Sequence, residues 1–278
     1  MTWFDALILG IVEGLTEYLP VSSTGHLILT QWLLGLDQEP ELRQAVDSFN
    51  IIVQSGAILA VLGLYRARVV QMLQGLVGKN PDGQRLAFQL IVAFIPAAIL
   101  GPLLDSRIED YLFHPAPVIL ALFLGGILML VVAKRHQIRD AMAGFEVEDL
   151  TYRMAFLIGL AQTVAMWPGT SRSMMTIVAA ILLGMRPRAA AEISFLLGLV
   201  TLGAATVYKS IQGGQQMIEQ LGVMPVVVGL IAATVSAALA VEWFVNFLSR
   251  KGLAPFGWYR LVLSAVLVAL TLAGTLTF

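Results

Sequence analysis

The sequence predicts an all-α integral membrane protein with six transmembrane helices, two re-entrant helical hairpins and an inverted-topology internal repeat. Of its 278 residues, 58% are hydrophobic and only 13% are charged, whereas a soluble domain carries about 25% charged residues. The apolar segments have the length of helices, which excludes a transmembrane barrel of short alternating strands. Two polar segments with ionisable side chains interrupt the apolar regions, and such groups are costly at membrane depth unless they form a site.

Composition also excludes several classes of function. The chain has no cysteine, so disulfides, thiolate nucleophiles and cysteine-ligated metals are excluded. Its formal net charge of −1 gives no sign of nucleic-acid binding. The N-terminus lacks the basic region of a signal peptide, and we expect residues 1–278 to form a single membrane domain.

The first two apolar segments are short. Residues 6–19 and 22–36 flank Pro20, and each is shorter than the roughly 20 residues that a transmembrane helix needs. We therefore expect them to form a re-entrant hairpin. Residues 154–167 and 174–185 repeat this pattern and predict a second hairpin.

Six further segments are long enough to cross the bilayer. They are residues 48–65, 86–104, 116–133, 189–208, 224–248 and 257–277. If both short pairs are re-entrant, twelve of the 17 lysines and arginines fall on one side of the membrane. The positive-inside rule makes that side the cytoplasm and places both termini outside.

The two halves of the chain are weakly similar. Gly10 and Gly159 begin related pentapeptides 149 positions apart, and Pro20 and Pro168 lie 148 apart, each with a serine three residues later. A short pair followed by three spans occurs twice, and an odd number of crossings per unit inverts the second unit. The first unit is residues 1–133 and the second is residues 154–278. Residues 134–153 form the cytoplasmic loop that joins them.

Glu13 and Glu17 are the acidic residues of the first polar segment. They lie four apart and would share one face of a helix, where like charges repel unless a cation or a proton lies between them. This pattern favours a divalent-metal site or a general base. A protonated pair, or a pair that reaches the headgroups, is the alternative. Gln162 takes the place of Glu13 in the second half.

Both polar segments contain a predicted helix start. Ser22 or Ser23 would cap the helix after the first proline, and its free backbone N–H groups would bind an anion. Residues 168–173 repeat this arrangement, and Gly169 would give access to the backbone. Two such helix ends that meet would form a cradle for phosphate groups. Ordinary capping explains the serines but not Arg172.

Arg172 and His26 are the two basic groups of these segments. Arginine stays protonated and offers a planar fork that fits phosphate oxygens. At membrane depth it needs an anion, either one of the two glutamates or a substrate phosphate. His26 follows Ser22 and Ser23 by about one helical turn, and could be a nucleophile, a base for Ser23, a proton donor to the leaving group, or a structural residue.

At these motifs the chain resembles the bacterial undecaprenyl-diphosphate phosphatase family linked to bacitracin resistance. The first family motif is met at Glu13, Glu17, Pro20, Ser22, Ser23, Gly25 and His26. The second is met at Pro168, Gly169, Ser171, Arg172, Ser173 and Thr176. One departure is Met174, where the pattern has a small residue. The likeness extends over essentially the whole chain.

The resemblance implies hydrolysis of a C55 isoprenoid diphosphate to its monophosphate and inorganic phosphate, which regenerates the lipid carrier of cell-wall synthesis. It also implies dependence on Mg²⁺ or Ca²⁺, and a site open to the periplasmic side of the bacterial cytoplasmic (inner) membrane. A homodimer is left open.

From the residues and the resemblance together we predict three sets of site residues. The catalytic residues are Glu13, Glu17, Ser23, His26 and Arg172. Glu13 and Glu17 would hold the metal ion. Substrate contacts fall to Ser22, Thr24, Gly169, Thr170, Ser171, Ser173, Thr176 and Gln54.

The same inverted repeat would also suit a transporter or flippase for a lipid phosphate or another anion, and a non-catalytic lipid-binding protein is a third reading. Transport needs only the charges of the cradle. The hydroxyl groups and the imidazole beside it favour chemistry.

Overall fold

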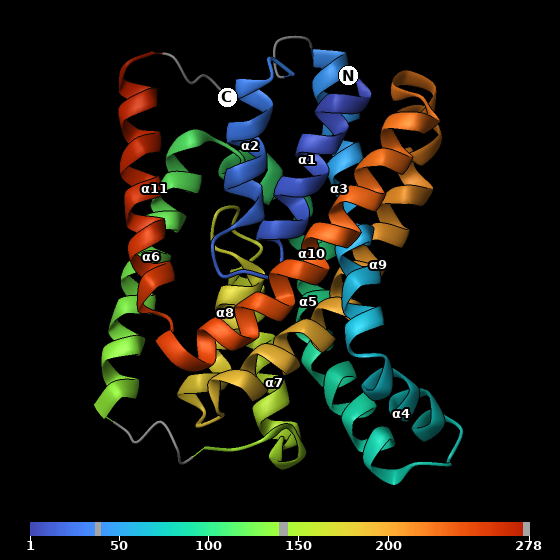
Figure 1. Cartoon of the computed structure of the whole chain (residues 1–278), viewed down its shortest axis with the longest axis vertical. Helices are drawn as coiled ribbons and strands as arrows, with labels where there is room; N and C mark the ends of the chain where they lie inside the picture. The colour runs from blue at the N-terminus through green and yellow to red at the C-terminus, as the bar shows by residue number, and fades with distance from the viewer. Residues whose placement is uncertain (37–39, 139–143, 275–278) are drawn as a thin grey trace.

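The computed structural model describes residues 1–36, 40–138 and 144–274, and these residues are helical throughout apart from turns and one isolated β-bridge (Figure 1). The helices are α1 (Trp3–Thr16), α2 (Ser23–Leu33), α3 (Pro40–Leu64), α4 (Arg66–Leu76), α5 (Pro81–Leu112), α6 (Pro115–Ile138), α7 (Tyr152–Val164), α8 (Arg172–Leu182), α9 (Pro187–Leu221), α10 (Val223–Lys251) and α11 (Ala254–Leu272), with a short 3₁₀ helix η1 (Val147–Asp149).

All six predicted spans are confirmed as helices that are long and apolar enough to cross a membrane. They lie in α3, α5, α6, α9, α10 and α11. The last predicted span, 257–277, ends beyond α11, and its final residues lie outside the described part of the chain.

The polar connections contain more helix than we predicted. The polar segment between the first two predicted spans carries several basic residues and was expected to be a loop, but residues 66–85 contain α4 and the start of α5. Helix α5 continues through Pro96 and Pro102 to Leu112, across another predicted loop. Charged residues keep a segment out of the bilayer, but they do not end a helix. The backbone hydrogen bonds of a helix lie within the helix itself, so they persist where it leaves the membrane.

Glycines allow the shortest approaches between helices. A Cβ at Gly10 would collide with Gly229 on α10, and a Cβ at Gly14 would collide with Ser236, so this G-x-x-x-G pair allows the close helix packing that such a pattern favours. In the second half, a Cβ at Gly159 would collide with the backbone of α5.

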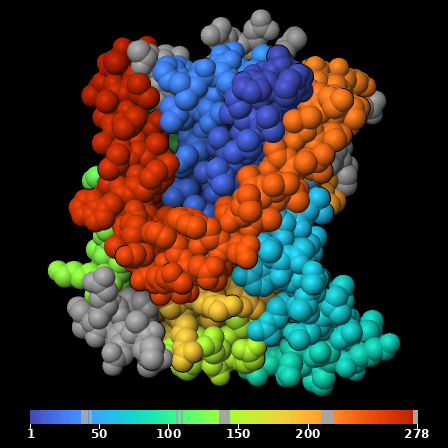
Figure 2. All heavy atoms as spheres, in the orientation of Figure 1, coloured from blue at the N-terminus to red at the C-terminus, as the bar shows by residue number. Residues whose placement is uncertain are grey.

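The short helices form two helix–turn–helix units that point toward each other. In Figure 1, α1 and α2 lie at the end of the molecule where α1 begins and α11 finishes, which we call the α1 end. Helices α7 and α8 lie at the opposite end, which bears α4 and which we call the α4 end. In the space-filling view of Figure 2, α10 crosses diagonally over this face and α11 returns along the edge, so both frame the first unit.

Candidate functional site

The two turns between the short helices adopt the same unusual backbone conformation. Ser22 and Ser171 have φ values of +73° and +75°, a region that non-glycine residues rarely occupy and that costs about 1–3 kcal/mol. Each serine caps the helix that follows, with its Oγ accepting from the backbone N–H of Gly25 or Met174 at 3.3 Å. Strain of this kind is concentrated at functional sites. The equivalent serines are thus Ser22 and Ser171, whereas the proline spacing had paired Ser171 with Ser23.

Glu17 and Arg172 join the two turns by a buried ion pair. Arg172 Nη2 lies 3.1 Å from Glu17 Oε1, and the side chains are 12% and 5% exposed. The other carboxylate oxygen, Oε2, accepts from Ser23 Oγ at 2.7 Å and from Gln54 Nε2 at 3.1 Å. The structure therefore brings together four predicted site residues from α2, α3, α8 and the turn after α1.

Several neighbours hold the guanidinium of Arg172. Its Nη1 donates to Ser194 O at 3.0 Å, and its Cζ lies 5.4 Å from the ring centroid of Tyr18, within the range of a cation–π interaction. A Cβ at Gly198 would lie 2.7 Å from Nη1, so this glycine leaves room for the fork. The Nε atom is buried and has no hydrogen-bond partner among the described residues. Tyr18, Ser194 and Gly198 were not predicted as site residues.

Glu13 is almost completely buried, at 1% exposure. Neither of its carboxylate oxygens has a hydrogen-bond partner in the part of the chain that the structure describes. The amide of Gln162, its predicted counterpart, is likewise buried and unpaired there. A buried carboxylate without donors requires a proton or a cation.

The donor set fits a hard cation at Glu13. Carboxylate oxygens are the ligands that Mg²⁺ and Ca²⁺ prefer, and those of Glu13 are uncommitted. Both oxygens of Glu17 already accept hydrogen bonds. No group of three or more His, Asp or Glu residues that could hold a metal ion occurs among the described residues.

The hydroxyl groups of α8 connect the two turns and the neighbouring helix. Ser173 Oγ donates to Leu19 O at 2.8 Å and lies 3.1 Å from Ser171 Oγ. Thr176 Oγ1 lies 2.7 Å from the Oγ of Ser194. Thr176 is fully buried and bonds to the protein itself, so its predicted role as a substrate contact is not supported by its geometry.

Two other predicted contacts, Thr24 and Thr170, are neighbours of this cluster in sequence but do not bond to it in the described part of the chain. No side-chain hydrogen bond joins Thr24 or Thr170 to the Glu17–Arg172 cluster within the described ranges. Gly169 has φ +91°, and a Cβ there would lie 2.5 Å from Val118 O on α6. The absence of a side chain at Gly169 allows this close contact with α6. We had expected it to give a ligand access to the backbone.

The contacts of His26 determine its tautomer. Nδ1 lies 2.7 Å from Ser22 O, which can only accept, so Nδ1 carries the proton. The opposite nitrogen, Nε2, lies 2.6 Å from the hydroxyl of Tyr259, which donates to it when the imidazole is neutral. The two rings are parallel, with centroids 5.6 Å apart. His26 is therefore not hydrogen-bonded to Ser23, whose proton points to Glu17.

Arg260 ties the two turns to each other and to α6. From its position near the end of a predicted span, Arg260 was expected to reach the headgroups or to pair with an acid. Both expectations are wrong, because it is 0% exposed and its hydrogen-bond partners among the described residues are backbone oxygens. It donates to Pro20 O at 3.4 Å and to Gly169 O at 2.8 Å, and to Leu122 O and Ala121 O on α6. One side chain thus fixes the positions of both turns.

Met174, the departure from the family pattern, is accommodated next to Arg260. It is 1% exposed, and a Cβ at Gly125 would collide with Arg260 and approach Met174 Sδ to 2.9 Å. The absence of a side chain at Gly125 leaves room for both. Met174 therefore belongs to the packing beneath the turn.

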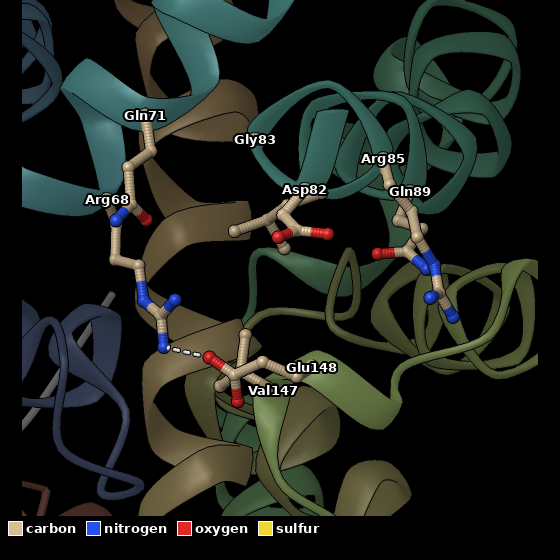
Figure 3. Close-up of a pocket in the computed structure, with 9 residues that line it drawn as sticks. Arg68, Gln71, Asp82, Gly83, Arg85, Gln89, Val147 and Glu148 are labelled. Carbon is tan, nitrogen blue, oxygen red and sulfur yellow. Dashed lines mark hydrogen bonds and ion pairs between the residues drawn. The ribbon is translucent and has the colours of Figure 1, made fainter. Parts of the chain in front are cut away.

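A second polar pocket lies at the α4 end, between α4, α5 and η1 (Figure 3). Arg68 is paired with Glu148 and Glu192, each at 2.7 Å, and Arg85 donates to Leu150 O. The cavity volume is about 60 Å³, which suits a few water molecules. The cations of this pocket are compensated. By contrast, Arg172 has an unpaired buried donor and Glu13 has two unpaired buried acceptors among the described residues.

Comparison with known proteins identifies relatives over nearly the whole chain. The profile of the family described as bacitracin resistance protein BacA matches residues 6–266. A protein of Sorangium cellulosum named undecaprenyl-diphosphatase is 46% identical over 96% of this chain and 86% of its own length. Proteins of the same name from Ectopseudomonas mendocina and Nitrosospira multiformis are 42% and 39% identical, over 96% and 99% of this chain and 93% and 98% of their own lengths.

Proposed function

Because the chain belongs to the bacitracin resistance protein BacA family, we propose that it hydrolyses undecaprenyl diphosphate to undecaprenyl phosphate and inorganic phosphate. It is a membrane phosphatase that recycles the lipid carrier of cell-wall synthesis. The Glu17–Arg172 pair carries this assignment, since it joins the two turns at a buried point and leaves Arg172 Nε without a partner.

We assign the binding of the terminal phosphate to Arg172 and the two capped helix starts. The unpaired Nε and the neighbouring Nη2 form one edge of the fork, which suits two oxygens of a phosphate group. When a phosphate takes this edge, it shares Nη2 with Glu17, and Glu17 Oε2 keeps the hydrogen bond from Ser23.

Ser23 is the nucleophile in this proposal. Its Oγ donates to Glu17 Oε2 at 2.7 Å, which is the hydrogen-bonded nucleophile and base that covalent catalysis requires. Glu17 accepts the hydroxyl proton while Ser23 Oγ bonds to the terminal phosphorus, the bridging P–O bond breaks, and undecaprenyl phosphate leaves. Water then attacks the phosphoserine, releasing inorganic phosphate and returning the proton to Ser23.

Glu13 is the residue that would hold a divalent cation, Mg²⁺ or Ca²⁺. A bound cation would neutralise charge on the phosphoryl group during transfer. The burial of Glu13 and its unpaired oxygens support this role.

We further propose that both helix–turn–helix units are re-entrant and that the two halves form an inverted repeat in the bacterial inner membrane. Matching contacts support this arrangement: α1 packs on α10 and α7 on α5, while α3 meets α9 and α6 meets α11. The lysines and arginines of α4, of the α8–α9 junction and of the end of α10 lie at the α4 end, which favours a cytoplasmic position for it. The first unit would then enter from the periplasm.

The direct test is phosphate release by the purified protein in detergent. With undecaprenyl diphosphate and Mg²⁺ or Ca²⁺ present we expect multiple turnovers, suppressed by a chelator and absent from Arg172→Ala. No release by the wild-type protein, or full turnover by a folded Arg172→Ala variant, would refute the assignment.

A further inference from the structure

Arg260 on α11 is a charged residue in the core of the molecule. Its side chain is fully buried, and none of the ion pairs in the described part of the chain involves it. Burying a charge without an acidic partner is costly, and apolar side chains often fill such positions with no loss of stability. The presence of an arginine here therefore indicates a task that an apolar side chain could not perform.

The donors of Arg260 are directed at the two turns. Nη2 donates to Gly169 O at 2.8 Å, and Nη1 donates to Pro20 O at 3.4 Å, which is a long hydrogen bond. Two further bonds, from Nε to Leu122 O at 3.3 Å and from Nη2 to Ala121 O at 3.1 Å, hold the guanidinium against α6. One planar group thus connects both turns to the same helix.

The two carbonyl groups occupy equivalent positions in the two halves of the chain. Pro20 and Gly169 lie 149 residues apart, which is also the separation of Ser22 and Ser171, the two serines with positive φ. Each carbonyl lies three residues before the first residue of the helix that follows its turn. Arg260 therefore holds the same point of each turn.

The first residues of these two helices are Ser23 and Arg172. They are the proposed nucleophile and the proposed phosphate ligand, and both bond to Glu17, at 2.7 Å and 3.1 Å. Phosphoryl transfer from a phosphate held by Arg172 to Ser23 depends on how the start of α2 lies relative to the start of α8.

We propose that Arg260 is a positioning residue for phosphoryl transfer, whose guanidinium sets the start of α2 against the start of α8 so that Ser23 and Arg172 reach one phosphate group. The inference rests on the proposed function, because it gives Arg260 a part in the reaction of those two residues. A guanidinium presents donors on three nitrogens in a rigid fork, whereas an ammonium group offers its donors from a single point. The proposal therefore requires the fork as well as the charge.

Arg260→Lys keeps the charge and removes the fork. We expect kcat for phosphate release from the C55 diphosphate to fall about a hundredfold, the scale of a misplaced reacting group. KM should stay within about threefold of the wild-type value, because Arg172 still binds the phosphate. The control is Arg250→Lys at an exposed position on α10, which should keep the wild-type kcat and KM.

Gly125→Ala keeps Arg260 and disturbs its position. A Cβ at Gly125 on α6 would collide with Nη2 of Arg260, the nitrogen that holds Gly169, and the buried fork cannot move without losing these bonds. We expect the same selective fall in kcat, of about tenfold or more. The control is Gly203→Ala on α9, where a Cβ would meet no atom within 4 Å.

Binding can be measured without turnover. A methylene analogue of the C55 diphosphate, in which CH₂ replaces the bridging oxygen, should bind the wild-type protein, Arg260→Lys and Gly125→Ala with similar Kd. Loss of binding in step with the loss of kcat would contradict a role confined to positioning.

Size-exclusion profiles and the apparent Tm in detergent show whether the variants fold, and a variant that folds decides the question if the other does not. A folded Arg260→Lys or Gly125→Ala variant with wild-type kcat would reject the proposal and leave the phosphatase assignment in place. Failure of both variants to fold would make Arg260 a structural residue and would also reject the proposal. Wild-type protein that releases no phosphate would overturn the proposed function itself.

Discussion

Arg172 links phosphate binding to the chemical step, because it is assigned to bind the phosphate and is paired with Glu17, the proposed base for Ser23. Two of its three nitrogens already hold Ser194 and Glu17, and the third is buried without a partner in the described structure. An unsatisfied buried donor on a charged group costs several kcal/mol. We infer that a substrate phosphate repays this cost, and that the resting ion pair keeps the site ordered between turnovers.

The two glutamates should respond differently to neutralisation. Glu13→Gln removes the carboxylate with uncommitted oxygens, and we expect the Mg²⁺ or Ca²⁺ concentration for half-maximal phosphate release to rise by about tenfold or more. Glu17→Gln removes the acceptor of Ser23 and should lower turnover at every cation concentration. Identical cation midpoints for Glu13→Gln and wild type would show that Glu13 does not hold the cation.

Tyr259 should position the imidazole of His26, which the sequence predicts as a catalytic residue. In Tyr259→Phe the imidazole keeps its bond to Ser22 O but loses its partner at Nε2, and one lost hydrogen bond of about 1.4 kcal/mol corresponds to a roughly tenfold lower kcat. We expect KM to stay close to the wild-type value. The matched control is Tyr208→Phe, because Tyr208 is an exposed tyrosine on α9. Equal kcat values for the two variants would show that Tyr259 does not position His26 for catalysis.

At the scale of elements, the sequence predicted the positions of the two turns between the short helices. It did not predict the tertiary contacts that hold these turns in place. The short apolar runs and the serines after each proline predicted the helices α2 and α8 and their caps, because these signals are local. The contacts of Arg260 with both turns could not be predicted, since they join positions 240 and 91 residues apart. Its position near a span end suggested a surface role, and only packing places it in the core.

The difference between local and tertiary signals also explains why α4 and the start of α5 were not predicted. Charge placed 66–85 outside the bilayer, and that segment is α4 followed by the start of α5. Asn80 caps α5 with its side chain, which was a readable signal. The contact of α4 with α5 is tertiary: a Cβ at Gly75 or Gly83 would collide with the other helix.

The attachment of α4 should depend weakly on pH. The hydrogen bond from Arg68 lowers the pKa of Glu148 below its ordinary value, so this pair contributes stability above about pH 4.3 and loses it as the pH falls through the lowered pKa. Glu148 is 63% exposed, which limits the contribution to at most about 0.5 kcal/mol.

We therefore expect Glu148→Gln to lower the apparent Tm in detergent slightly at pH 7, and the difference from wild type to vanish in acid. Glu242→Gln, a change at another exposed position, should have no such pH dependence. A difference that grows as the pH falls would mean that the ion pair does not support the folded state.

For the whole molecule, the proposed orientation places the α4 end, which bears the lysines and arginines of α4 and of the α8–α9 junction, in the cytoplasm. The chain has no cysteine, so single cysteines report topology without background. A membrane-impermeant maleimide added to intact cells should label Val223→Cys at the α1 end, and should label Lys251→Cys at the α4 end only after permeabilisation. The reverse pattern would invert the proposed orientation.

The resemblance in two motifs was sufficient to assign the family, and the comparisons confirm it over residues 6–266. The meeting of Arg172 with the acidic segment was also predicted from the sequence, because a buried arginine needs an anion. The sequence could not predict that Arg172 pairs with Glu17 and not with Glu13. Residues four apart lie on the same face of a helix, and only the geometry of the turn distinguishes the two glutamates.

The central claim is that Glu17 and Arg172 act as one unit on a lipid diphosphate. A double-mutant cycle of Glu17→Gln, Arg172→Gln and their combination, measured as kcat/KM for phosphate release from the C55 substrate, tests it most directly. We predict that each single change costs roughly a hundredfold and that the double change costs little more. Losses that multiply, or a folded single variant with wild-type turnover, would contradict the account.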